Sequence, residues 1–147
     1  MRIALVLPGG VDASGTERVI PAFLWLVERL ARQHDVHVFA LHQQPEPGSW
    51  PLLGACVTNI GTVPGRRRRF LARFAEEHRS RAFDVVHALF GGAGVYAAIA
   101  AWRHGIPMLL HLAGGEPVSD PAFAYGQRCT WRGHGATWSR GGGSARW

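Results

Sequence analysis

The sequence predicts an α/β fold, in which a doubly wound, Rossmann-like parallel sheet carries helices on both faces of a single domain. Short apolar runs alternate along the chain with segments whose apolar residues recur every three or four positions. Runs that are apolar throughout indicate strands buried on both faces, and their alternation with amphipathic helices indicates crossover connections. The length of 147 residues suits one domain rather than two.

Each expected strand is short and apolar, and most are closed by turn residues. Arg2 to Leu7 is followed by Pro8-Gly9-Gly10, and Asp84 to Phe90 is followed by Gly91-Gly92. A loop is expected over 43–51, because its three prolines disfavour regular structure. The complete set of expected strands is 2–7, 35–41, 56–60, 84–90 and 107–112.

Three helices are expected between these strands. The first carries one wide apolar face between Val19 and Leu30. Ser14-Gly15-Thr16-Glu17 before it fits a capping box, but Pro21 would then interrupt the helix at a cost of up to about 3 kcal/mol unless the helix starts later. The start of this helix is therefore left open. The other two helices are expected over 66–81 and 95–103.

The composition excludes several chemistries. All 16 basic residues are arginine, set against 10 acids, which gives a formal net charge of +6. A chain without lysine has no Schiff-base lysine, no phosphate-binding lysine of a G-K-[ST] loop and no lysine base. Codon bias in a GC-rich genome is the usual cause of such arginine usage, so the charge by itself carries little functional weight. It still favours anionic partners.

The sequence predicts a cytoplasmic protein. Cys56 and Cys129 lie far apart in different contexts, which fits free thiols better than a disulfide framework. The apolar run after Met1 is too short for a signal peptide. The longest apolar stretch, 95–102, is also too short to span a bilayer, which needs about 20 residues.

Glycine pairs follow three of the expected strands and are the main signal for a ligand site. In doubly wound sheets, ligands bind beyond the carboxyl ends of the strands. The loop from Gly9 to Glu17 lets the backbone approach a ligand and points N–H groups at the following helix, which favours an anion; the alternative is an ordinary turn. The candidate substrate-binding residues are Gly9, Gly10, Gly15, Thr16, His87, Gly91, Gly92, Gly114, Gly115 and Glu116.

Two of these candidates have alternative explanations that the sequence leaves open. His87 ends a strand, where it either faces the ligand or is a core histidine with a satisfied ring nitrogen. Glu116 either binds an acceptor hydroxyl or is simply solvated after a turn. A nicotinamide or flavin site is not expected, because the first loop is not G-x-G-x-x-G and Leu41-His42 stand where an acid would hold the ribose.

The order of the motifs resembles the amino-terminal domain of glycosyltransferase family 4, which has the GT-B fold. The resemblance rests on the opening strand with its Gly-Gly loop and long helix, on Asp84-Val85-Val86-His87, and on Gly105-Ile106-Pro107. It covers roughly residues 1–125. Two positions depart from the family: Leu89 and Ala113 stand where that family often has histidines, and His111 lies two residues before Ala113 on the same face of its strand.

The resemblance implies the acceptor-binding half of a retaining transferase that uses a nucleotide-sugar donor. Family members place the donor site and two glutamates eight positions apart in a second domain, and no two glutamates of this chain have that spacing. We therefore expect a chain truncated before its donor-binding domain, inactive or weakly active alone, with a sugar or lipid-linked acceptor as partner. No metal or resident cofactor is expected, and whether the chain alone is an enzyme stays open.

The competing hypothesis is a non-catalytic module that holds a small anionic ligand or a partner chain on the same glycine-rich rim. Arg66, Arg67, Arg68 and Arg69 also suggest peripheral contact with an anionic membrane, with the stripe of Phe70, Leu71 and Phe74 either inserting or forming core. Nucleic acid is not expected, because no interleaved aromatic platform accompanies the arginines.

Residues 126–147 form the second expected segment, an irregular tail after the domain at 1–125. The tail holds six glycines, four arginines and three tryptophans, with no acid and no apolar periodicity. A disordered basic tail would explain this composition, but natural tails rarely expose three tryptophans. A frameshifted reading frame is therefore the favoured interpretation.

Overall fold

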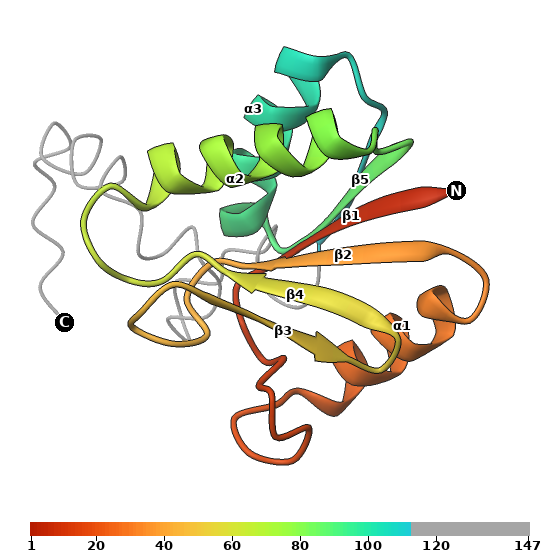
Figure 1. The fold of residues 1–147 in the computed structure, drawn as a ribbon, viewed down its shortest axis with the longest axis vertical. Helices are drawn as coiled ribbons and strands as arrows, with labels where there is room; N and C mark the ends of the chain where they lie inside the picture. The colour runs from red at the N-terminus through yellow and green to blue at the C-terminus, as the bar shows by residue number, and fades with distance from the viewer. Residues whose placement is uncertain (113–147) are drawn as a thin grey trace, which may run out of the picture. The chain divides into compact units, whose positions relative to one another are not determined.

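A computed structural model describes residues 1–112 as a six-stranded sheet with three helices (Figure 1). The central strand β1 pairs in parallel with β2 on one side and with β5 on the other. The elements in chain order are β1 (Arg2–Leu7), α1 (Pro21–Ala31), β2 (Asp35–Ala40), β3 (Gly48–Leu52), β4 (Ala55–Asn59), α2 (Arg66–Ser80), β5 (Val85–Leu89), α3 (Gly91–His104) and β6 (Met108–His111).

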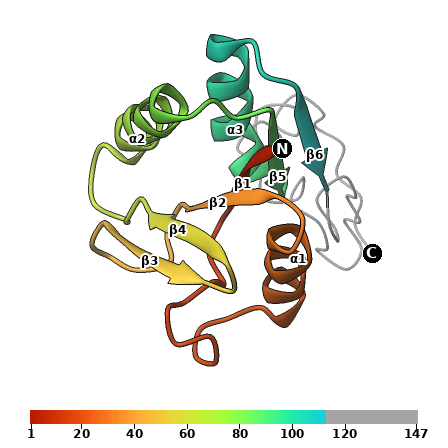
Figure 2. The same cartoon turned by 45° about the vertical axis from the view of Figure 1, so that its right-hand side comes forward.

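The strand order is β3-β4-β2-β1-β5-β6, and every neighbouring pair is parallel except β3 with β4. Helix α1 packs on one face of the sheet, whereas α2 and α3 pack on the other (Figure 2). A parallel sheet that is covered by helices on both faces is doubly wound. The predicted α/β class and Rossmann-like topology are therefore confirmed.

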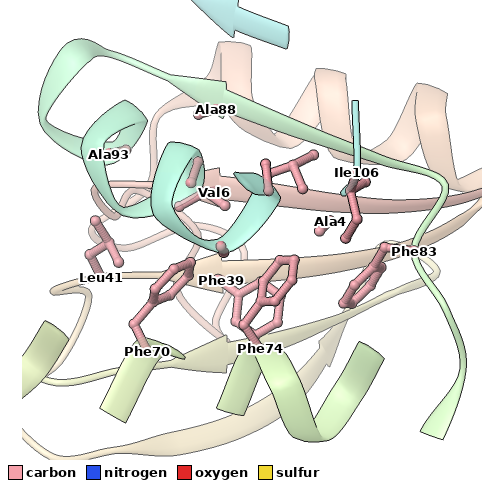
Figure 3. Packing of buried hydrophobic residues seen from close by; sticks show 14 of the residues in the cluster. Ala4, Val6, Phe39, Leu41, Phe70, Phe74, Phe83, Ala88, Ala93 and Ile106 are labelled. Atoms are coloured by element: carbon pink, nitrogen blue, oxygen red, sulfur yellow. The ribbon is translucent and has the colours of Figure 1, made fainter. Parts of the chain in front are cut away.

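Aromatic side chains fill the core between the sheet and α2. Phe39 of β2 lies under Phe70 and Phe74 of α2, with ring centroids 5.6 and 5.5 Å from its own (Figure 3). Phe83 closes the same cluster, 5.1 Å from Phe74. Since Phe70 and Phe74 are fully buried, the apolar stripe of α2 belongs to the core.

Two local expectations are corrected, and the start of the first helix, which the sequence left open, is located. Gly48–Leu52, expected as loop, forms the edge strand β3, whose partner β4 is antiparallel; proline is tolerated at a sheet edge. Helix α1 starts only at Pro21, where proline is the first helical residue and costs no hydrogen bond, so the capping box does not cap it. Helix α3 starts at Gly91, four residues before its expected start.

Arg2 ties the amino ends of the strands to α2. Its guanidinium donates to the backbone oxygens of Glu77 and Arg81 and contacts the Glu77 carboxylate at 3.1 Å and the Asp35 carboxylate at 3.3 Å. The Arg2 side chain is only 10% exposed. A charge this deeply buried persists only when it is paired and hydrogen-bonded, as it is here.

Histidines that are partly or fully removed from solvent make the stability of the fold dependent on pH. Burial lowers the pKa of His37, His42, His78 and His87 below the ordinary histidine value. As the pH falls below about 7, the unfolded chain therefore takes up protons before the folded one, and stability declines, most of all through the buried His37.

We therefore expect thermal unfolding to occur at a lower temperature at pH 5 than at pH 7.5. His37→Gln should reduce this difference, because His37 is 4% exposed and its charged form is strongly disfavoured. Calorimetric scans of both proteins across this pH range measure the effect. A Tm independent of pH from 7.5 to 5 would contradict the assignment.

Candidate functional site

The carboxyl ends of the parallel strands define the candidate site. The loop after β1 begins at Pro8 and the turn after β5 at Phe90, and these strands are neighbours with Val6 opposite Ala88. Strand β1 leads to α1 on one face and β5 leads to α3 on the other. The point where the winding direction reverses is where doubly wound sheets bind ligands. Gly9-Gly10 and Gly91-Gly92 are brought to it, as expected from the sequence.

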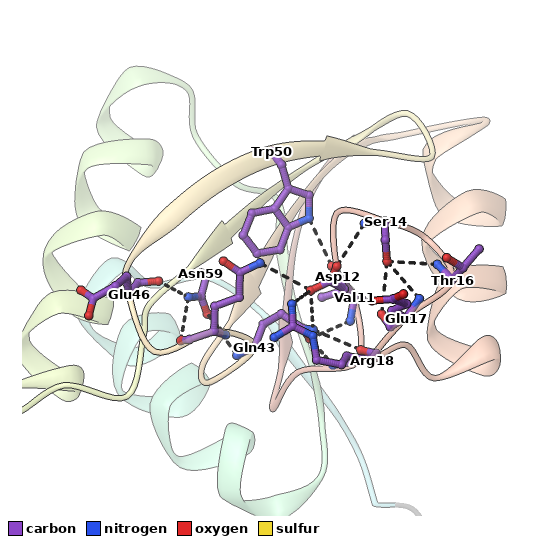
Figure 4. A network of polar contacts seen from close by, with 12 residues as sticks. Val11, Asp12, Ser14, Thr16, Glu17, Arg18, Gln43, Glu46, Trp50 and Asn59 are labelled. Carbon is purple, nitrogen blue, oxygen red and sulfur yellow. Dashed lines mark hydrogen bonds and ion pairs between the residues drawn. The ribbon is translucent and has the colours of Figure 1, made fainter.

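The glycine loop after β1 is bound by a side chain that follows β2. The Gln43 side-chain oxygen accepts from the N–H of Gly10 at 2.5 Å and of Val11 at 2.9 Å (Figure 4). Gln43 is held in turn by Asn59 at the end of β4, whose side-chain oxygen accepts from the Gln43 N–H at 3.1 Å. Three neighbouring strands therefore fix the loop at the carboxyl edge.

The N–H groups of the second half of the loop, from Ser14 to Glu17, are paired within the loop itself. The Ser14 hydroxyl accepts from Thr16 and Glu17, and the Gly15 N–H donates to the Asp12 carbonyl. Chain atoms therefore already occupy these N–H groups, and the expectation that the loop binds an anion stays a prediction. A ligand that used the Gly10 and Val11 donors would have to displace Gln43. Whether Gly9, Gly10, Gly15 and Thr16 bind substrate by other contacts stays a prediction.

Asp12 is the charged centre of this network. Its carboxylate accepts from the Ser14 N–H at 3.1 Å, pairs with Arg18 at 2.7 Å and contacts the Gln43 amide at 3.3 Å. The Ser14 backbone N–H is the main cause of the lowered pKa of Asp12, whereas burial acts the other way. Asp12 is therefore an ionised hydrogen-bond acceptor at the edge of the crevice.

Replacing Gln43 tests the network. Gln43→Ala leaves the N–H groups of Gly10 and Val11 without their acceptor, and an unsatisfied buried donor costs about 1–3 kcal/mol. The neighbouring Gln44→Ala removes one long contact to Asp12, of 3.4 Å, and should change stability by no more than about 0.5 kcal/mol. Urea unfolding of the two variants measures the difference in stability, and equal unfolding midpoints would show that Gln43 does not stabilise the glycine loop.

Phe90 turns the chain sharply from β5 into α3. Its backbone angles are φ 70° and ψ 148°, a region that costs a residue with a side chain about 1–3 kcal/mol. The turn is held by the Phe90 N–H, which donates to the His111 carbonyl at 2.9 Å, and by the edge contact of its ring with Phe23. The strained turn at Phe90 therefore sets the direction in which α3 leaves the carboxyl end of β5.

The first residues of α3 are Gly91 and Gly92, where a helix carries partial positive charge. Gly92 is exposed, and a Cβ built on it would meet no atom within 4 Å. The backbone is therefore accessible to a ligand at Gly92.

His87 lies two residues before the end of β5, opposite Leu5 and Leu109. Its Nε2 is buried and contacts no polar partner among the described residues. Burial, and to a smaller degree the neighbouring His111, lowers the pKa of His87, so the ring is neutral at pH 7. Whether His87 faces a ligand or is a core histidine remains open. A core histidine would require a hydrogen-bond partner for its ring nitrogen, and among the described residues Nε2 has none.

Several residues that build the edge were not found from the sequence. Asp12 could have been found, since an aspartate two residues before a serine fits an Asx turn, in which the side chain accepts from the N–H two positions on. Gln43 and Phe90 gave no local signal. The candidates Gly114, Gly115 and Glu116, and the departure at Ala113, lie outside residues 1–112.

Within residues 1–112, no group of three histidine, cysteine, aspartate or glutamate side chains could hold a metal ion. In the same part of the chain, no helix is both long and apolar enough to cross a bilayer.

The four consecutive arginines of α2 divide into two pairs. Arg66 donates to the Tyr96 hydroxyl, and Arg69 donates to the carbonyls of Ile60 and Pro64. Arg67 and Arg68 are exposed and line a hollow of about 490 Å³ together with Arg103. Of these four arginines, Arg67 and Arg68 therefore supply the outward-facing charge.

The strand order and the helices on both faces define a Rossmann-like domain whose candidate site is the carboxyl edge of its sheet. The chain belongs to the glycosyl transferase 4-like domain family, whose model matches residues 19–146. The matched range extends past residue 125, and the boundary between domain and tail stays a prediction.

Among solved structures, the chain is similar to the C-terminal domain of a hydrogenase from Pyrococcus furiosus. The two are 15% identical with a TM-score of 0.47, over 75% of this chain and 89% of that one. No curated protein matches the chain.

Proposed function

We propose that this domain binds the acceptor of a retaining, nucleotide-sugar-dependent glycosyltransferase. The observation that carries the proposal is the family match over residues 19–146, combined with the glycine-rich carboxyl edge at the reversal point of the sheet. Members of such a family transfer sugars, and the crevice lies where doubly wound domains hold their ligands.

The chemistry of the crevice suits a ligand rich in hydroxyl groups. The carboxyl edge carries a buried, ionised carboxylate at Asp12, a half-buried amide at Gln43 and accessible backbone at Gly92. Carboxylates and amide oxygens accept hydrogen bonds from hydroxyls, and amide N–H groups donate to them. A sugar, or a lipid carrier that ends in one, offers both kinds of group.

Transfer requires a second domain in this proposal. The donor and the groups that stabilise charge in the transition state are assigned to that domain, with the reaction taking place in the cleft between the two halves. The chain alone should therefore bind acceptor and show little or no transfer.

Gly92→Val is the test variant. Its side chain would protrude into the crevice without meeting protein atoms, since the space beside Gly92 is empty. Ala98→Val on the exposed side of α3 is the matched control. Titration of labelled protein with a panel of methyl glycosides should move the Gly10 and Gly92 amide signals saturably, and Gly92→Val should weaken this binding by about tenfold or more.

Two outcomes contradict the proposal. Equal effects of Gly92→Val and Ala98→Val would show that the crevice is not the binding site. Tight stoichiometric binding of UDP-glucose or GDP-mannose by calorimetry would place the donor on this domain instead. Binding of small anions in place of glycosides would favour the non-catalytic module.

We also propose that the outward-facing arginines of α2 contact an anionic membrane surface. Arg67, Arg68 and Arg103 supply the charge, at about 1 kcal/mol per residue near such a surface. The contact is electrostatic, because Phe70 and Phe74 are buried in the core and cannot insert. Vesicle binding should therefore weaken steeply with salt, whereas salt-resistant binding would contradict the proposal.

A further inference from the structure

A second hollow lies on the α2 face of the sheet, beside the edge hairpin of β3 and β4. It measures about 480 Å³, and its lining includes Ser49, Thr58, Arg69 and Arg73. Ser49 and Thr58 face each other across the antiparallel pair, whereas Arg69 and Arg73 lie one helical turn apart on α2. Hydroxyls from the sheet and guanidinium groups from the helix therefore meet around one space.

Buried side chains support the hydroxyl side of this hollow. The Ser49 hydroxyl is 3.2 Å from the Thr58 hydroxyl, which lies 3.0 Å from the His37 ring nitrogen Nε2. Thr58 and His37 are each only 4% exposed, whereas Ser49 is exposed. A chain of hydrogen bonds thus runs from the interior to a single hydroxyl that faces the hollow. Such a chain holds the Ser49 oxygen in place better than an isolated surface serine.

One of the two guanidinium groups that line the hollow is also held in place by the fold. Arg69 donates to the Ile60 carbonyl at 2.8 Å and to the Pro64 carbonyl at 3.1 Å, so its guanidinium is held while further N–H groups remain for a ligand. Arg73 is paired with Glu76 at 2.7 Å, an exposed contact that a competing anion can replace at little cost. The two guanidinium groups outnumber this single carboxylate.

We propose that this hollow is a binding site for a phosphate group, with Arg69 and Arg73 as counter-charges and the Ser49 hydroxyl as a hydrogen-bond partner. Guanidinium groups match the geometry of tetrahedral oxyanions and bind them through charge-assisted hydrogen bonds. The hollow is lined in part by Asn59, which also holds Gln43, but its two arginines and its hydroxyls take no part in the glycine loop network. It binds either a soluble phosphate ester or the phosphate of a lipid headgroup.

Three variants test the site, and two of them make the same change of arginine to glutamine. Arg73→Gln removes a cation that the fold does not need, and Ser49→Ala removes the hydroxyl. Arg67→Gln is the control, because it removes the same charge from the same helix at the other hollow. Each is titrated with inorganic phosphate by heteronuclear NMR at constant ionic strength, and the Ser49 and Thr58 amide signals are followed.

We expect saturable shifts at these amides. Arg73→Gln should weaken binding by about fivefold or more, Ser49→Ala by about two- to fivefold, and Arg67→Gln by less than about twofold. Equal losses in Arg73→Gln and Arg67→Gln would overturn the proposal, because binding would then follow helix charge alone. Shifts without saturation would overturn it as well.

Two further ligands identify the source of the phosphate. Glycerol phosphate that competes with inorganic phosphate supports a soluble ester. Vesicles that contain phosphatidic acid and lose binding with Arg73→Gln support a headgroup. Vesicle binding that depends on Arg67 and not on Arg73 counts against this hollow. None of these results depends on glycoside binding at the crevice, so this proposal and the acceptor proposal can fail separately.

Discussion

Phe74→Ala should destabilise the folded protein by about 3–5 kcal/mol, which is the usual cost of removing a buried phenylalanine. Phe74 is fully buried and contacts the rings of Phe39, Phe70 and Phe83. These partners come from β2, α2 and the segment before β5, so a cavity at this point loosens the attachment of α2 to the sheet. Such a loss is a large part of the stability of a small domain.

Trp102→Ala is the control for this prediction. Trp102 is also a large aromatic residue, but it is 83% exposed, so its removal should change the free energy of unfolding by no more than about 0.5 kcal/mol. Urea unfolding followed by circular dichroism compares the two variants. If Phe74→Ala unfolded at the same urea concentration as the parent protein, α2 would not be anchored as described.

Arg2→Leu should cost about 3–5 kcal/mol, because it leaves the carboxylate of Glu77 partly buried without its guanidinium partner. The substitution also leaves the carbonyls of Glu77 and Arg81 without the guanidinium that donates to them. Hydrogen exchange should show the loss first in α2 and in the amino ends of β1 and β2, where these partners lie.

The matched control for Arg2 is Arg32→Leu. Arg32 forms an exposed pair with Glu28 on α1, and such surface pairs contribute about 0–1 kcal/mol. Because both changes replace an arginine with leucine, their difference isolates the effect of burial. Equal destabilisation would mean that Arg2 contributes only as a surface charge.

The sequence correctly predicted the strands whose apolar pattern matches their burial in the folded domain. Strands β1 and β2 were predicted within a residue or so of their ends, because each is mostly apolar and almost entirely buried. Strand β3 was missed, since its signal is weak and the three prolines of 43–51 favour a loop. Only the pairing with β4, a tertiary interaction, makes it a strand.

The location of the candidate site could be predicted from the sequence, whereas the contacts between its residues could not. Strand ends with glycine pairs located the edge, because parallel strands bring their carboxyl ends together. Gln43 could not be assigned from the sequence, since its partners at Gly10 and Val11 lie more than thirty residues away. The strain at Phe90 was also invisible, because phenylalanine is not a residue that favours positive φ.

Strand β3 also determines at which edge of the sheet a further strand can pair. Pro51 lies within β3 and has no N–H, so it cannot donate to a strand added beside it. Natural sheets use proline at an edge in this way to prevent pairing with other chains. Met108–His111 of β6, at the opposite edge, contains no proline and no residue of fixed charge. Any strand added to this sheet is therefore expected to pair with β6, which gives the domain one direction for extension or association.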